Sequence, residues 1–150
     1  IQEIQLFSKK FQSINIISSM NKNYFKIIRS GINTTFQDMG RENLYHIGIP
    51  FGGAMDNRNF LLSNKLVQND LSSPVIEFAY QGPLMKYYGD KINIAVTGDV
   101  NFKIKKKQKN FIGNCYESYL IEDGDEIDIL STNKSVYGYF AIGAEFDLKY

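Results

Sequence analysis

The stretch that decides the fold is residues 75–97, VIEFAYQGPLMKYYGDKINIAVT. It contains short apolar runs that are separated by turn residues, Gln81-Gly82-Pro83 and Gly89-Asp90. Runs of this length, rich in β-branched and aromatic residues and bounded by Gly, Pro and Asp, are typical of sheet strands. The stretch therefore predicts successive strands that are connected by short turns.

The same pattern recurs before and after this stretch. The predicted strands are Phe25 to Arg29, Val75 to Tyr80, Leu84 to Tyr88, Ile92 to Thr97, Asn101 to Ile104, Glu117 to Ile121, Glu126 to Leu130 and Val136 to Ile142. Turn residues such as Gly98-Asp99 and Asp123-Gly124-Asp125 stand between the later strands. Short strands at this spacing predict a mainly β fold, either a sandwich or a barrel.

Residues 56–69 depart from the strand pattern. Apolar residues at positions 60, 62, 66 and 67 form a helical stripe, and Asp56 is a good N-cap. We predict one helix near residues 56–69. It is expected to end close to Asn69, because asparagine tolerates the left-handed conformation at a helix C-terminus.

Composition indicates one domain without a polyanionic partner. The chain has 150 residues, of which 43% are hydrophobic, enough for one core of ordinary size. Its 17 basic and 16 acidic residues give a formal charge of +1, which argues against binding to nucleic acid or to an anionic membrane. The lysine-rich residues 103–109 are interpreted as a solvated hairpin tip. A single cysteine, with neither a signal peptide nor an apolar run of membrane-spanning length, predicts a cytoplasmic location.

The domain itself is predicted to comprise residues 24–150. Residues 1–23 are an N-terminal extension, either foreign to the domain, with Met20 as the natural start, or packed on the barrel as an added helix or strand. No closing turn follows the last predicted strand, Val136 to Ile142. We therefore expect residues 24–150 to be the N-terminal part of a longer domain.

Glycines are concentrated in residues 35–56, where Gly52 and Gly53 come just before the predicted helix start. Glycine allows positive φ values and lets a ligand or a second backbone approach closely. Amide groups at a helix N-terminus favour an anion, so Gly52 and Gly53 are candidates for binding a carboxylate, a phosphate or a developing oxyanion. The alternative is a tight turn, capped by Asp56, that binds no ligand.

Other polar residues in the same region also suggest chemistry. His46 can act as a general acid or base, or it can be a structural hydrogen-bonding group. Gln37 and Arg41 lie in one glycine turn, where Arg41 either binds a substrate carboxylate or pairs with Asp38 or Glu42. With one histidine and one cysteine in the chain, no zinc site is predicted.

Glu77 lies inside a predicted strand and has apolar neighbours on both sides. Alternation along that strand places it on the same face as Val75 and Ala79. There it either faces a partly enclosed cavity, where it needs a partner such as Arg41, or lies on a solvated sheet face.

The longest motifs resemble a known family. They are TFQDMGR at 35–41, HIGIPFGGAMD at 46–56, NKLVQN at 64–69, Glu77 with Gly82-Pro83, and TGD at 97–99. From about Phe25 to Asp147 the chain resembles the N-terminal half of the KipA-like subunit of 5-oxoprolinase. This is a biotin-dependent carboxyltransferase group that is also called the allophanate hydrolase subunit 2 family. One departure is Ala144-Glu145, which stands where the family usually has two adjacent glycines. The resemblance implies a cyclophilin-like β-barrel.

The resemblance also implies partners and a reaction. Such proteins work with two sister subunits of the 5-oxoprolinase complex, one of them KipI-like, to open 5-oxoproline to glutamate. The complex uses ATP, and this chain is expected to bind no cofactor directly. In urea carboxylase a related pair of domains transfers a carboxyl group from carboxybiotin to urea, so a biotin-dependent reaction on urea or a related amide is one alternative. A second alternative is a non-catalytic regulatory module of the KipA type, whose loop residues Ile49, Pro50, Phe51 and Met55 contact a partner.

Roles for the candidate residues follow from this resemblance. The glycine amides would stabilise negative charge on the substrate's amide oxygen, an arginine would hold its carboxylate, and an acidic or imidazole group would transfer protons. Family members are about twice as long as this chain, so a pocket built from both halves would be incomplete here. The catalytic candidates are Asp56 and His46, and the substrate-binding candidates are Gln37, Arg41, Gly52, Gly53 and Glu77.

Overall fold

The computed structural model describes residues 3–7, 23–41, 43–50, 52–107 and 109–148. Within these ranges there are twelve strands, one α-helix and one short 3₁₀ helix. The helices are η1 (Tyr45–Ile47) and α1 (Asn57–Leu66). The strands are β1 (Glu3–Phe7), β2 (Asn23–Arg29), β3 (Thr35–Gln37), β4 (Val75–Ala79), β5 (Leu84–Tyr88), β6 (Ile92–Thr97), β7 (Val100–Lys105), β8 (Asn110–Gly113), β9 (Ser118–Ile121), β10 (Glu126–Thr132), β11 (Tyr137–Ile142) and β12 (Glu145–Phe146).

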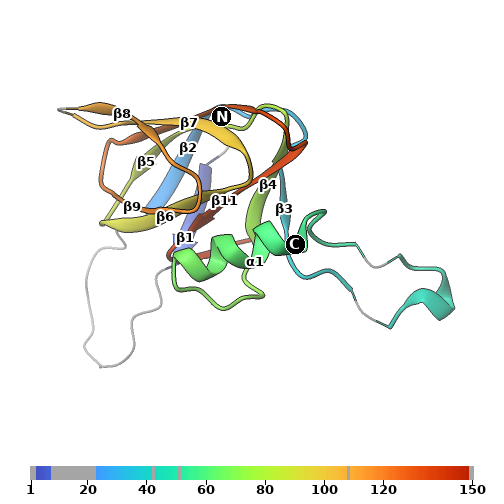
Figure 1. Cartoon of the computed structure of the whole chain (residues 1–150). Helices are drawn as coiled ribbons and strands as arrows, with labels where there is room; N and C mark the ends of the chain where they lie inside the picture. The colour runs from blue at the N-terminus through green and yellow to red at the C-terminus, as the bar shows by residue number, and fades with distance from the viewer. Residues whose placement is uncertain (1–2, 8–22, 42, 51, 108, 149–150) are drawn as a thin grey trace, which may run out of the picture.

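The strands form two antiparallel sheets (Figure 1). The larger sheet has the order β12-β1-β2-β5-β10-β7-β8, and the smaller has the order β3-β4-β11-β6-β9. All eight predicted strands are present, with ends that differ from the prediction by at most two residues. The predicted mainly β fold with one helix is therefore confirmed.

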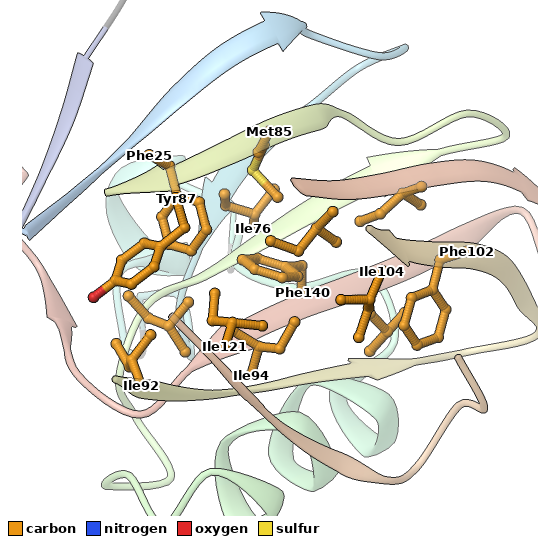
Figure 2. Close-up of a cluster of buried hydrophobic side chains, with 14 of the residues drawn as sticks. Phe25, Ile76, Met85, Tyr87, Ile92, Ile94, Phe102, Ile104, Ile121 and Phe140 are labelled. Carbon is orange, nitrogen blue, oxygen red and sulfur yellow. The ribbon is translucent and has the colours of Figure 1, made fainter. Parts of the chain in front are cut away.

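The main core fills the space between the two sheets (Figure 2). Alternation along β4 sends Ile76 and Phe78 into this core, while Glu77 faces the other side of the sheet. From β11, Phe140 meets Phe25 of β2 edge-on, with 5.7 Å between the ring centroids. Because aromatic rings from both sheets interlock in this way, the strands enclose one apolar interior, as a barrel-like fold requires.

Helix α1 covers the outer face of the smaller sheet (Figure 1). Its Phe60 and the following Val67 pack against Val75, Tyr139 and Ala141 from the strands beneath. This second, smaller cluster, which also contains Ala95 of β6, anchors the helix on β4, β6 and β11. The loop that precedes the helix is consequently held against two of these strands, β4 and β11.

The start of α1 agrees with the prediction, but its end does not. Asp56 is the N-cap, as predicted, and its side chain accepts the N–H of Asn59. The helix ends at Leu66 rather than close to Asn69, and the residue with left-handed φ is Gln68, at 60°. Asn69 is instead tied to the sheet, because its Nδ2 donates to the carbonyl of Ile142 at 2.7 Å.

Three short strands, β3, β8 and β12, and the 3₁₀ helix are additional to the prediction, whereas β1 agrees with the alternative of an added strand in residues 1–23. β1 lies inside the predicted extension and pairs with β2 and β12, whereas residues 8–22 lie outside the described residues. β3, β8 and β12 have two to four residues each, too few to show a period. The predicted strand from Val75 includes Tyr80, which in fact lies just after β4 and has a φ of 59°.

The end of the lysine-rich stretch forms the predicted hairpin turn between β7 and β8, whereas residues 103–105 belong to β7. The N–H of Lys106 donates to the carbonyl of Lys109 at 3.0 Å and closes the turn. None of the helices in the described ranges has the length and apolar character needed to cross a membrane.

Candidate functional site

The glycine-rich segments on either side of residues 43–50 pack against each other. The N–H of Ala54 donates to the carbonyl of Asp38 at 3.0 Å, and the carboxylate of Asp38 accepts the N–H of Gly40 at 2.7 Å. Gly40 and Gly53 both have left-handed φ values, 80° and 82°. A Cβ on Gly53 would lie only 2.6 Å from the nitrogen of Gly40, so this close approach of two backbones requires glycine.

A buried carboxylate and a buried phenol hold the loop that follows. Glu77 of β4 and Tyr139 of β11 are direct register partners, 2% and 0% exposed. Glu77 Oε2 accepts the N–H of Met55 at 2.8 Å and the hydroxyl of Tyr139 at 2.7 Å. The Tyr139 oxygen in turn accepts the N–H of Asp56 at 2.7 Å. Two consecutive backbone amides are therefore bound by side chains of adjacent strands.

The electrostatics of this pair keep the phenol protonated. Burial, and then the hydrogen bond to Glu77, raise the pKa of Tyr139 well above its ordinary range. The hydroxyl therefore donates to the Glu77 carboxylate throughout the neutral and moderately alkaline range. Glu77 does not lie on a solvated sheet face, because its carboxylate is buried beneath the loop.

The carboxylate of Asp56 is oriented by Asn59. Asp56 Oδ1 accepts the N–H of Asn59 at 3.1 Å, and Oδ2 accepts Asn59 Nδ2 at 2.7 Å. The backbone carbonyl of Asn59 accepts the hydroxyl of Thr97 at 2.8 Å, and its Oδ1 accepts that of Tyr116 at 2.9 Å. Asn59 thus links the helix start to β6 and to the turn before β9.

Two amides of the loop are not used within the described part of the chain. The N–H groups of Ala54, Met55 and Asp56 all have acceptors, whereas those of Gly52 and Gly53 donate to no described protein atom. Gly52 is exposed and Gly53 is half-buried. Amides next to the start of a helix can bind a ligand with an anionic or carbonyl oxygen.

The other predicted site residues lie around this loop rather than beneath it. Gln37 is in β3, half-buried, and its Nε2 donates to Thr35 Oγ1 at 3.0 Å. His46 is exposed in η1, on residues 43–50, which project from the sheets as an arm (Figure 1). Arg41 is exposed at the base of this arm.

The predicted pairing of Glu77 with Arg41 is wrong, because the chain turns outward at Gly40 and the buried carboxylate bonds the loop amide and Tyr139 instead. Asp38 bonds the N–H of Gly40, and Glu42 and Phe51 lie outside the described residues.

Sequence reasoning missed Tyr139, Asn59, Thr97 and Tyr116. Alternation along β11 does place Tyr139 on the helix-facing side of the sheet together with Ala141. The missing information was the register, because Glu77 and Tyr139 are 62 positions apart.

No group of three potential metal ligands was found among the residues that the structure describes. A hollow of about 280 Å³ lies at the other end of α1, beside Gln68, Asn93 and Gly143. None of the predicted site residues lines it. Within the described residues, the candidate site is an exposed loop on a buried support.

These features define a mainly β domain with a glycine-rich loop that is fixed on one sheet. The family model described as carboxyltransferase domain, subdomain A and B, matches residues 47–150. The chain belongs to this family.

Similar proteins include parts of larger enzymes. The chain is 36% identical over 95 residues to urea amidolyase of Saccharomyces cerevisiae, a match that covers 61% of this chain and 5% of that protein. It is 44% identical over 52 residues to a 5-oxoprolinase subunit of Escherichia coli, a match that covers 35% of this chain and 17% of that protein. The matched regions are thus small parts of both relatives.

Solved structures agree on the fold. The crystal structure of Kluyveromyces lactis urea carboxylase matches 79% of this chain and 10% of its own, with a TM-score of 0.72 and 28% identity. The crystal structure of TTHA0988 matches 83% of this chain and 46% of its own, with a TM-score of 0.69 and 23% identity, and supports the fold alone.

Proposed function

We propose that this chain supplies part of the substrate site of an enzyme complex that acts on a small amide. The first candidate reaction is the ATP-dependent opening of 5-oxoproline to glutamate. The alternative is the biotin-dependent transfer of a carboxyl group to urea or a related amide. Membership in the carboxyltransferase family, with similarity to both a 5-oxoprolinase subunit and urea amidolyase, supports both reactions.

The observation that carries this proposal is the pair of available amides at Gly52 and Gly53 ahead of α1. In ring opening, the oxygen of a water molecule bonds to the carbonyl carbon and the ring C–N bond breaks. Negative charge develops on the carbonyl oxygen, where donors at about 2.7–3.1 Å are most effective. Asp56 or His46 takes a proton from the water and returns one to the leaving nitrogen.

Arg41 and Gln37 are proposed to recognise the rest of the substrate. A guanidinium binds a carboxylate through two parallel hydrogen bonds, and Arg41 is exposed at the base of the arm, where its head is accessible. 5-Oxoproline carries such a carboxylate and urea does not. Arg41 therefore separates the two candidate reactions.

Exposed apolar side chains on the arm and the loop support a contact with further subunits. Tyr45, Ile47 and Met55 are 68%, 60% and 66% exposed on the arm and the loop. Exposed apolar side chains of this size are typical of a contact with another protein. We propose that the KipI-like subunit and the remaining subunit of a 5-oxoprolinase complex are the partners that complete the site.

The proposal is tested by purifying the chain with these two partner subunits and measuring two reactions. One is ATP-dependent release of glutamate from 5-oxoproline, and the other is urea-dependent consumption of carboxybiotin. For the first reaction, Arg41→Gln is expected to raise KM roughly tenfold or more, because a charged hydrogen-bonded pair is lost. Arg58→Gln, which removes an exposed arginine from the first turn of α1, is the matched control and should leave KM unchanged.

The outcomes separate the candidates. Turnover of 5-oxoproline that depends on Arg41 supports the first reaction. Turnover of urea that is insensitive to Arg41→Gln supports the second. A stable complex with the KipI-like subunit that turns over neither substrate contradicts both and favours the regulatory module, to which the exposed Tyr45, Ile47 and Met55 also point.

A further inference from the structure

We infer that Glu77 and Tyr139 are positioning residues, which set the geometry of the glycine loop and do not contact the substrate. This inference rests on the proposed function of the loop. It assigns a role to Tyr139, and it changes the expected role of Glu77 from substrate binding to support of the loop from beneath.

Burial is the first argument. Glu77 is 2% exposed and Tyr139 is 0% exposed, so neither side chain is accessible to a ligand while the loop is in place. One oxygen of this carboxylate nevertheless accepts two hydrogen bonds, from the Met55 N–H and from the Tyr139 hydroxyl. A buried carboxylate requires such donors, and removing either one leaves a costly unsatisfied group.

The second argument is the rigidity of the frame. Glu77 and Tyr139 lie directly opposite each other on neighbouring strands, so the sheet itself fixes their separation. They bind consecutive amides, those of Met55 and Asp56. The loop is consequently aligned with the sheet at two adjacent points, more tightly than a single hydrogen bond would allow.

The third argument concerns the loop amides that have no acceptor within the described residues. The amides of Met55 and Asp56 face the sheet, and that of Ala54 faces Asp38. The amides that remain for a ligand are therefore those of Gly52 and Gly53. Loss of the inner acceptors would free Met55 and Asp56 to rotate, and the orientation of the glycine amides relative to Asp56 would no longer be fixed.

Substitutions at Glu77 separate positioning from substrate binding. Glu77→Gln keeps a carbonyl oxygen that can accept the same two hydrogen bonds but removes the negative charge. Glu77→Ala removes the acceptor altogether. A positioning role predicts that Gln preserves function and Ala does not, whereas binding of a substrate group by the negative charge would be lost in both variants.

The experiment measures amide hydrogen exchange by NMR on the full chain and, in parallel, kcat and KM of the reconstituted complex. Tyr139→Phe is expected to accelerate exchange at Asp56 about tenfold or more relative to amides of β10, because this N–H loses its acceptor. Glu77→Ala should do the same at Met55, whose N–H donates to Glu77. In the complex Tyr139→Phe should lower kcat by a similar factor and change KM less than about threefold. Glu77→Ala should behave in the same way, and Glu77→Gln should stay within about threefold of wild type.

Tyr87→Phe is the matched control. Tyr87 is also fully buried and its hydroxyl also donates to the backbone, at Asp90, but it lies in the larger sheet. Its removal should leave the relative exchange at Met55 and Asp56 unchanged. Equal exchange in Tyr139→Phe and wild type, or equal damage by Glu77→Gln and Glu77→Ala, would overturn the inference. If the exchange pattern is found but the complex processes neither substrate, the positioning role stands and the proposed function fails.

Discussion

Gly53 illustrates how one residue type can be required by its neighbours as well as by its own conformation. Gly52 and Gly53 have similar left-handed φ values, 67° and 82°. A Cβ on Gly52 would meet no atom of the described residues within 4 Å, whereas one on Gly53 would lie 2.6 Å and 2.8 Å from backbone atoms of Gly40. Backbone cannot move aside as a flexible side chain can, so the two glycines should differ sharply in tolerance.

We therefore expect Gly53→Ala to lower the free energy of unfolding by about 3 kcal/mol, because strain at positive φ and a backbone clash add together. Gly52→Ala should cost only about 1 kcal/mol, from the left-handed conformation alone. Urea unfolding of both variants measures the difference. Equal losses would mean that the contact between the two glycine turns does not contribute to stability.

At the level of elements, the start of α1 combines a structural and a proposed chemical role in Asp56. Its carboxylate caps the helix through the N–H of Asn59, and it is also a candidate for proton transfer. The two roles have different chemical requirements. Capping needs one side-chain oxygen, whereas proton transfer needs an ionisable group.

Two substitutions separate these roles. Asp56→Ala should lower the free energy of unfolding by about 1 kcal/mol, because the first turn loses its cap. Asp56→Ser keeps a capping oxygen and should stay close to wild-type stability. If Asp56 transfers protons, both variants should lose most of the turnover of the reconstituted complex. An active Asp56→Ser variant would show that the carboxylate serves the helix alone.

At the level of the whole molecule, stability should depend mainly on the interface between the two sheets. Phe140 is fully buried at the centre of this interface, against Phe25 (Figure 2). Phe140→Ala is expected to lower the free energy of unfolding by about 3–5 kcal/mol, because it removes a buried ring and leaves a cavity. Ile112→Ala, at a strand position that is 71% exposed, should change it by less than about 0.5 kcal/mol. Thermal or urea unfolding measures both values, and similar losses would contradict this placement of the core.

Much of the fold was predictable from the sequence because its signals are local. Residues 75–97 contain the alternation and the turns that define β4, β5 and β6, and Asp56 marks the helix start within a few positions. Short elements such as β3 and β12 carry no such signal, because two or three residues cannot display a period. They form where longer strands already provide a partner.

The candidate site, like the fold, has features that the sequence predicts and others that depend on the tertiary structure. The amino-acid sequence by itself determined that glycines 52 and 53 stand before a capped helix, that Glu77 shares a strand face with Val75, and that one apolar core is possible at this length. Only the tertiary structure decided that Tyr139, 62 positions from Glu77 and 83 from Asp56, bridges the two, and that Arg41 is not the partner of Glu77. The physical reason is that alternation and capping act over a few residues along the chain. The register between strands, by contrast, depends on how both sheets pack as a whole.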